Sequence, residues 1–136
     1  MAGYSGTPLA KKLGIKEGFN LLFVNAPHGF DKELELPADV TINSRGRQPL
    51  DLVLLFVTTK GELDRAFSKY SAKLRPAGML WISWPKKSSG VPSDLSDNVV
   101  RELGLAKGMV DVKVCAVDEI WSGLKFVFRL KDRPKK

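Results

Sequence analysis

The candidate catalytic and ligand-binding residues of this sequence lie at the ends of its apolar runs. His28, the only histidine, lies in the turn-like stretch Asn25–Gly29 after the first such run. It can act as a general base or a hydrogen-bond donor at neutral pH. No serine, cysteine or acidic residue stands at catalytic-motif spacing from it, so an exposed turn histidine is the simpler interpretation. Thr58 and Thr59 end the next long apolar run and complete this first set of candidate ligand-binding residues.

A second set follows the apolar run that ends at Trp84. Lys86 and Lys87 come directly after this run and precede a predicted helix, where an anion such as phosphate can bind. Charged pairs in loops are also commonly just solvated. Trp84 can stack on a flat ligand, or it can belong to the core. Both interpretations stay open at this stage.

Trp121 and Cys115 are the remaining candidates. Trp121 lies in a predicted turn, where it either folds back over the sheet edge or marks an interaction surface for a partner. Cys115, the only cysteine, excludes an internal disulfide and fits a reducing compartment. Nothing near Cys115 in sequence would lower its pKa, so we interpret it as a packing residue. One histidine and one cysteine cannot form a zinc site unaided, and no metal centre is predicted.

The element that must position these residues is the apolar run Leu52–Val57. Six apolar residues without alternation predict a strand covered on both faces, as in the centre of a parallel sheet. Residues 79–84 form a second run of this type, and residues 19–24 predict the first strand. Helical periodicity with capping-box spacing at Thr59 predicts a helix that ends before Pro76.

Other elements are predicted from weaker patterns. Thr7 is the expected N-cap of a short helix to Leu13, and residues 31–36 predict one or two helical turns. Residues 40–42 predict a weak second strand. Whether it is parallel stays open, because only eight residues, 43–50, separate it from the next strand. A third helix is expected from about Leu95 to Ala106, with Ser93 or Asp94 as its cap.

The last two strands alternate between apolar and polar residues, which predicts an antiparallel hairpin with one solvent-exposed face. Val110, Val112, Val114 and Ala116 are expected on the inner face of the first of them. The sequence therefore predicts one Rossmann-like α/β domain over residues 1–136, with 1–6 and 131–136 frayed. Its mostly parallel sheet has the strand order 2-1-3-4-6-5. A ligand crevice is expected between Asn25–Gly29 and Thr58–Thr59, with Trp84–Lys87 beside it.

The excess of basic residues invites a nucleic-acid interpretation. The formal net charge is +7 and the isoelectric point is near 9.6. Nearly half of the excess belongs to residues 131–136, and the other candidates are Arg45, Arg47, Lys86 and Lys87. No recognised nucleic-acid motif or row of aromatic residues accompanies them. No apolar run approaches the length of a membrane span and no signal pattern precedes the first helix, so a cytoplasmic protein is expected.

Asp51 at the start of the central strand, and Pro76–Gly78 before the next one, resemble the later half of class I S-adenosylmethionine-dependent methyltransferases. This resemblance covers roughly residues 49–130. Four stretches carry a second resemblance: Lys12–Ile15, Asp51–Val57, Trp84–Lys86 and Trp121–Gly123. They resemble an uncharacterised bacterial domain-of-unknown-function family, and this resemblance implies a fold and no established activity.

Two departures from the methyltransferase pattern decide the functional hypothesis. The turn Asn25–Gly29 has one glycine where a glycine-rich cofactor turn is expected, and residues 43–45 are polar and basic where an acid should hold the ribose. We therefore expect a non-catalytic methyltransferase-like module that acts through partner contacts or binds a small anionic ligand. No resident cofactor is expected. The alternatives are an active small-molecule or macromolecular methyltransferase with an atypical S-adenosylmethionine loop, and nucleic-acid binding through a basic face.

Overall fold

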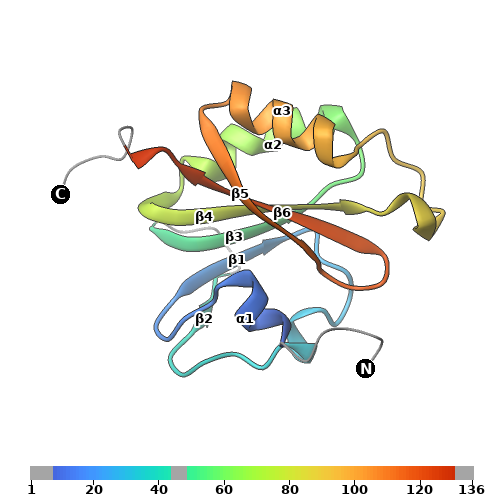
Figure 1. Ribbon diagram of the computed structural model, residues 1–136. Coiled ribbons are helices and arrows are strands. Elements are labelled where there is room, and N and C mark those ends of the chain that lie inside the picture. Colours follow the sequence, from blue (N-terminus) through green and yellow to red (C-terminus); the bar gives the residue numbers. More distant parts are fainter. Residues whose placement is uncertain (1–7, 44–48, 131–136) are drawn as a thin grey trace.

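One mixed β-sheet organises the chain in the computed structural model (Figure 1). Within residues 8–43 and 49–130, which the structure describes, six strands lie in the order β2-β1-β3-β4-β6-β5. The strands β1 to β4 are parallel, and β6 runs antiparallel to both of its neighbours. The predicted strand order and the antiparallel ending are confirmed. The elements in chain order are α1 (Leu9–Leu13), β1 (Asn20–Val24), η1 (Asp31–Glu33), β2 (Thr41–Ile42), β3 (Leu50–Phe56), α2 (Lys60–Ser71), β4 (Leu74–Pro85), η2 (Lys87–Ser89), α3 (Asp97–Ala106), β5 (Met109–Ala116) and β6 (Trp121–Phe128).

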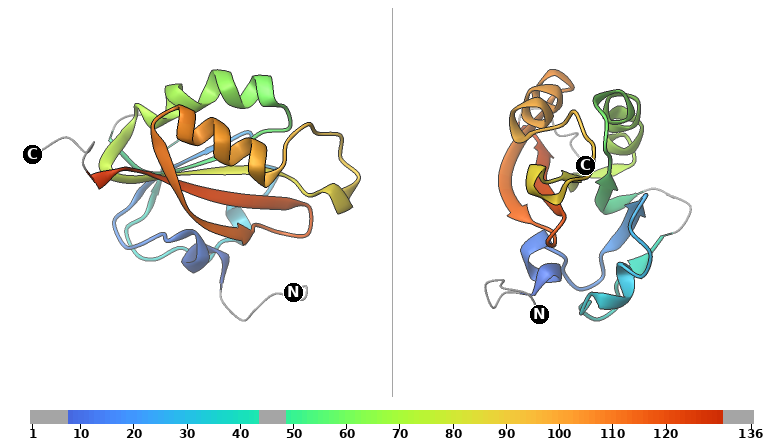
Figure 2. Two further views of the ribbon diagram at one scale, coloured as in Figure 1. Left: turned by 45° about the horizontal axis from the view of Figure 1, so that its top comes forward. Right: turned by 90° about the vertical axis from the view of Figure 1, so that its right-hand side faces the viewer.

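The central strand β3 is covered on both faces, as its unbroken apolar run predicts. Val53 and Leu55 contribute to the core beneath α2 and α3, whereas Leu54 and Phe56 contribute to the core on the α1 side. None of these four side chains is more than 1% exposed. Each contributes about 1.5–3 kcal/mol on burial. Figure 2 shows the resulting layers, with α2 and α3 on one face of the sheet and α1 on the other.

The start of α2 confirms the predicted cap. The Thr59 Oγ1 atom accepts a hydrogen bond of 3.1 Å from the Glu62 N–H, and the Glu62 carboxylate accepts one of 2.9 Å from the Thr58 N–H. In a standard capping box the glutamate returns to the N-cap residue itself. Here it reaches one residue further, and this fixes the backbone at the carboxyl end of β3.

The start of α3 differs from the prediction. The helix begins at Asp97, and its cap is Ser96, whose Oγ accepts a hydrogen bond of 3.3 Å from the Val99 N–H. Ser93 and Asp94, the expected caps, are used elsewhere. The Ser93 hydroxyl donates to the Thr58 carbonyl at 2.7 Å, and Asp94 accepts a hydrogen bond of 2.7 Å from the N–H of the first residue of α2. These contacts hold the segment extended, so the helix starts two residues later than expected.

The first half of the chain matches its weaker predictions. Thr41 and Ile42 pair in parallel with Asn20 and Leu21, which answers the open question about this strand. One 3-10 turn occupies part of the predicted helical segment 31–36. The first helix has Pro8 at its N-cap, and the expected cap Thr7 lies outside the described residues, as do the ends 1–6 and 131–136. No described helix is long and apolar enough to cross a membrane.

The alternation predicted for β5 is wrong. Val112 and Val114, expected on the inner face, are 52% and 55% exposed. The pairing of β5 with β6 shifts register between Asp111 and Lys113. A bulge of one residue inverts the side-chain alternation of everything that follows it. The alternation of β6 holds, because Leu124 and Phe126 are both buried.

Candidate functional site

The crevice predicted between the ends of β1 and β3 is filled by aromatic side chains. Phe30, which follows the turn Asn25–Gly29, packs edge-to-face against Phe23 with ring centroids 5.4 Å apart and against Phe56 at 5.2 Å. Phe56 in turn meets Trp121 at 5.1 Å. This row of rings covers the carboxyl ends of β1 and β3, where an open α/β sheet usually binds its ligand.

The polar residues predicted to line that crevice mostly form hydrogen bonds with the backbone or allow a particular backbone conformation. Asn25 adopts a left-handed conformation (φ 60°), and its side-chain amide donates to the Phe56 carbonyl at 3.3 Å. Gly29 has φ 78°, a conformation that favours glycine. His28 is exposed in the same turn. Thr58 and Thr59 have the backbone and capping roles described for α2, and no residue of this first set lines the pocket described next.

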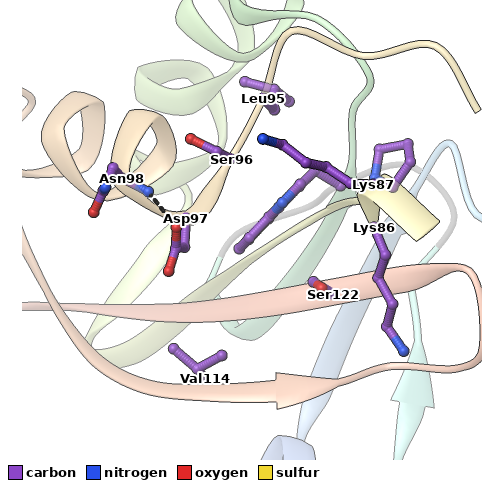
Figure 3. Close-up of a pocket in the computed structure, with 10 residues that line it drawn as sticks. Lys86, Lys87, Leu95, Ser96, Asp97, Asn98, Val114 and Ser122 are labelled. Atoms are coloured by element: carbon purple, nitrogen blue, oxygen red, sulfur yellow. Dashed lines mark hydrogen bonds between the residues drawn. The ribbon is translucent and has the colours of Figure 1, made fainter. Parts of the chain in front are cut away.

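An open pocket lies further along the sheet, between the end of β4, the start of α3 and the β5–β6 hairpin (Figure 3). Its volume is about 450 Å³, within the ordinary range for small-molecule sites. Trp84 and Leu95, each no more than 5% exposed, form its apolar part together with the exposed Val114. The remaining lining residues are Pro85, Lys86, Lys87, Ser96, Asp97, Asn98 and Ser122.

The charges of this pocket have unequal roles. The Lys86 ammonium donates to the Asp118 carbonyl at 2.8 Å, and Figure 3 shows its side chain directed away from α3. Lys87 extends toward the start of α3. Asp97 accepts a hydrogen bond of 2.8 Å from the Asn98 N–H. An anionic group in this pocket would therefore meet Lys87, whereas Asp97 offers a carboxylate to a donor group of the same ligand.

Three of the ten residues that line this pocket are among the predicted ligand-binding residues. Trp84, Lys86 and Lys87 were singled out, and the structure brings them together with residues that sequence reasoning missed. Ser96 and Asp97 were missed because the helix start was placed too early. A serine followed by an acidic residue signals a helix N-terminus, but both Ser93–Asp94 and Ser96–Asp97 have this pattern, so it could not choose between them.

The remaining candidates lie in the α1 core or outside the described residues. Trp121 is half-buried and packs on Phe56, so its ring folds back over the sheet, and an interaction surface there stays a prediction. Burial raises the pKa of the Cys115 thiol, although neighbouring lysines oppose this shift. The described residues contain no cluster of three or more potential metal ligands. Arg45, Arg47 and the tail lie outside the described residues.

Solved structures show which fold this arrangement belongs to. No protein-family model matches the sequence, and no curated protein is significantly similar to it. A S-adenosylmethionine-dependent methyltransferase from Aquifex aeolicus superposes with a TM-score of 0.62 and 14% identity over 87% of this chain and 86% of its own. Precorrin-6y C5,15-methyltransferase from Geobacter metallireducens gives 0.59 and 9% identity over 89% and 86%. The fibrillarin of Aeropyrum pernix, with natively bound S-adenosyl-L-methionine, gives 0.57 and 14% identity over 92% and 70%.

The fold is therefore that of the methyltransferases, and at these identities the similarity establishes the fold alone. The adenosyl cofactor that this fold implies does not fit the described residues at the β1–β3 crevice. Phe30 fills the space over the strand ends, and the turn Asn25–Gly29 contributes one glycine rather than a glycine-rich cradle. We derive no chemical step through that cofactor.

Proposed function

We propose that this chain is a non-catalytic module with a methyltransferase-like fold that binds a small anionic ligand in the pocket between β4, α3 and β6. One observation carries the proposal. The place where the fold would hold its cofactor is packed with Phe23, Phe30 and Phe56, whereas an open cavity of about 450 Å³ lies beside Trp84 and Lys87.

The composition of the pocket supports a small ligand with a flat or apolar part and an anionic end. Trp84, Leu95 and Val114 offer apolar surface, and burial of such surface drives binding without specific geometry. Lys87 supplies the positive charge. Asp97 on the helix side favours a ligand that carries a hydrogen-bond donor as well, because a purely anionic ligand would be repelled there.

Inorganic phosphate at mildly acidic pH is the first probe for this proposal, because H2PO4− carries hydroxyl donors for Asp97 as well as a negative charge for Lys87. Backbone amide NMR spectra of the full chain would be recorded during titration with phosphate, with Lys87→Gln as the test variant. Lys32→Gln is the matched control, since Lys32 is an exposed lysine of η1 on the other face of the sheet. We expect shifts confined to Ser96–Asn98 and Ser122 that disappear in Lys87→Gln and persist in Lys32→Gln. No shift at these residues at millimolar phosphate would remove the anionic ligand from the proposal.

The second candidate is an active methyltransferase with an atypical cofactor loop, and the fold similarity favours it. Thermal unfolding with S-adenosylmethionine separates the two. A ligand at 100 times its dissociation constant stabilises the folded state by about 2.7 kcal/mol. We expect no rise in Tm at millimolar cofactor. A rise, together with amide shifts at Asn25–Gly29, would support the enzyme and contradict our proposal.

A further inference from the structure

Four lysines that are distant in sequence converge on the α1 side of the sheet. Lys12 and Lys16 come from α1 and the segment after it, Lys113 comes from β5, and Lys125 comes from β6. The hydrogen bond from the Lys113 ammonium to the Lys12 carbonyl, at 3.0 Å, joins α1 to the edge of the sheet. Figure 2 shows α1 next to the β5–β6 ribbon. We call these four residues the lysine cluster.

Two ammonium groups of this cluster, those of Lys113 and Lys125, contact fixed parts of the fold. The Lys125 Nζ atom lies 5.9 Å from the centre of the Trp81 ring. Trp81 is completely buried and donates from its indole N–H to the Leu13 carbonyl at 2.9 Å, so it cannot move with the lysine. Lys113 uses one of its three donors on the Lys12 carbonyl, which leaves two for a ligand. Ordering these side chains in advance lowers the entropic cost of binding.

Three lysines of the cluster, Lys16, Lys113 and Lys125, form no ion pair with another described residue. The ion pairs between described residues involve Arg75, Arg101 and Lys107 instead. Partial burial lowers the pKa of the Lys125 ammonium, and repulsion by Lys113 and then Lys16 adds to this shift. Like charges brought together cost stability, and an anion bound between them would relieve that cost.

The surroundings favour a polyanion over a protein partner. Protein interfaces normally bury apolar anchors at their centre. Neither α1 nor β6 exposes a large hydrophobic side chain. Of the two exposed valines of β5, Val114 lines the pocket on the opposite face, and Val112 is a single exposed side chain rather than an apolar patch. Contacts made by charge alone are typical of proteins that bind the nucleic-acid backbone. Trp81 is buried, so it cannot stack on a base, and a duplex fits better than a single strand.

We propose that the lysine cluster of Lys12, Lys16, Lys113 and Lys125 binds the phosphate backbone of duplex nucleic acid without reading its sequence. This site is separate from the pocket beside Trp84, because the two lie on opposite faces of the sheet. It also differs from the basic residues considered for nucleic-acid binding from the sequence. None of these residues belongs to the cluster: Arg45, Arg47, Lys86, Lys87 and residues 131–136.

Fluorescence anisotropy with the full chain tests this proposal. The probe is a labelled DNA duplex of about 20 base pairs of mixed sequence, titrated at several salt concentrations; an RNA duplex of the same length is the second arm. The test variant is Lys113→Gln with Lys125→Gln. The matched control is Lys60→Gln with Lys69→Gln, which removes the same charge from exposed lysines of α2 on the other face. Lys16→Gln is a third variant, because the exposed side chain of this lysine forms no hydrogen bond or ion pair with the described residues.

We expect the test variant to weaken duplex binding and to reduce the salt slope, log K against log salt, by about 2, one unit for each lysine. Lys16→Gln should reduce it by about 1, and the control should leave it unchanged. Equal losses in the test and control variants would show that only net charge matters, and would overturn the proposal. Competition by poly-glutamate as strong as that by unlabelled duplex would assign the surface to an acidic protein and would overturn it too.

Discussion

Gly104 offers the sharpest test of how α3 is held against the sheet. A Cβ atom at this position would lie 2.7 Å from Cδ1 of Phe126 and closer still to two other ring carbons. Phe126 cannot retreat, because it is completely buried and packs against Phe67 at 5.4 Å. The absence of a side chain at Gly104 is thus what lets the helix approach β6. Since Ser96–Asn98 belong to the same helix, this approach also sets the width of the pocket.

The expected effect of Gly104→Ala follows from two opposing terms. Replacing a helical glycine by alanine gains up to about 1 kcal/mol in helix propensity, and Gly104 lies in the last turn of α3. Overpacking a filled core costs about 1–3 kcal/mol, and three overlapping ring atoms place this site at the upper end. We therefore expect a net loss of about 2 kcal/mol in the free energy of unfolding, or roughly 8 °C in Tm for a domain of this size.

Denaturant and thermal unfolding of Gly104→Ala, followed by circular dichroism, measure this loss. Gly61→Ala in α2 is the matched control. Its Cβ would meet the end of the Arg65 side chain at 3.3 Å, which can swing aside, so this substitution should stabilise the protein by about 0.5–1 kcal/mol. The double variant of Gly104→Ala with Phe126→Leu should lose less than the sum of the two single changes. If both glycine variants raise the Tm equally, the close approach of α3 to Phe126 is refuted.

Three further predictions test other parts of the structure. Phe30→Ala should cost about 1–3 kcal/mol of stability, because it removes two edge-to-face contacts and a partly buried ring. The variant should still show no rise in Tm with S-adenosylmethionine. A gain of cofactor binding would show that the aromatic side chain alone closes the crevice. Asp51→Ala should cost about 1–3 kcal/mol in chemical denaturation, because the carboxylate accepts a 2.7 Å hydrogen bond from the Asn20 N–H, whereas an unchanged midpoint would contradict this. The raised pKa of the Cys115 thiol lowers its thiolate fraction near neutral pH. Alkylation by iodoacetamide should therefore be slower than for free cysteine and should become faster as the pH rises through the raised pKa. Lys125→Gln should slow the alkylation further, and equal rates in the two proteins would contradict the effect of this neighbour.

The sheet could be predicted because the composition of its central strands indicates that both of their faces are buried. Leu52–Val57 has no polar residue on either face, and only a strand covered on both sides buries such a run. The start of α3 could not be placed in the same way. Ser93, Asp94 and Ser96 are all good caps, and the choice depends on where their side chains find partners. Two of them bond to residues 34 and 35 positions earlier, which no local pattern reveals.

The side-chain orientation along β5 could not be predicted for a similar reason. Alternation predicts which side chains share a face only while the register is continuous, and the bulge between Asp111 and Lys113 breaks it. The bulge carries no glycine or proline that would mark it in the sequence. Its consequence is functional, since it turns Val114 toward the pocket and Lys113 toward the lysine cluster. One extra residue therefore contributes to both proposed sites.

The position of a pocket at the carboxyl ends of parallel strands depends on which side chains the following loops place there. The segment after β1 brings Phe30 onto Phe56, and the segment before α3 closes the end of β3 through the bond from Ser93 to the Thr58 carbonyl. After β4, Lys86 turns toward Asp118 on the hairpin, and α3 begins only at Asp97. The pocket beside Trp84 therefore lies between β4 and α3, whereas aromatic rings pack at the ends of β1 and β3. We expect a ligand of this protein at Trp84 rather than at the crevice where this fold usually binds one.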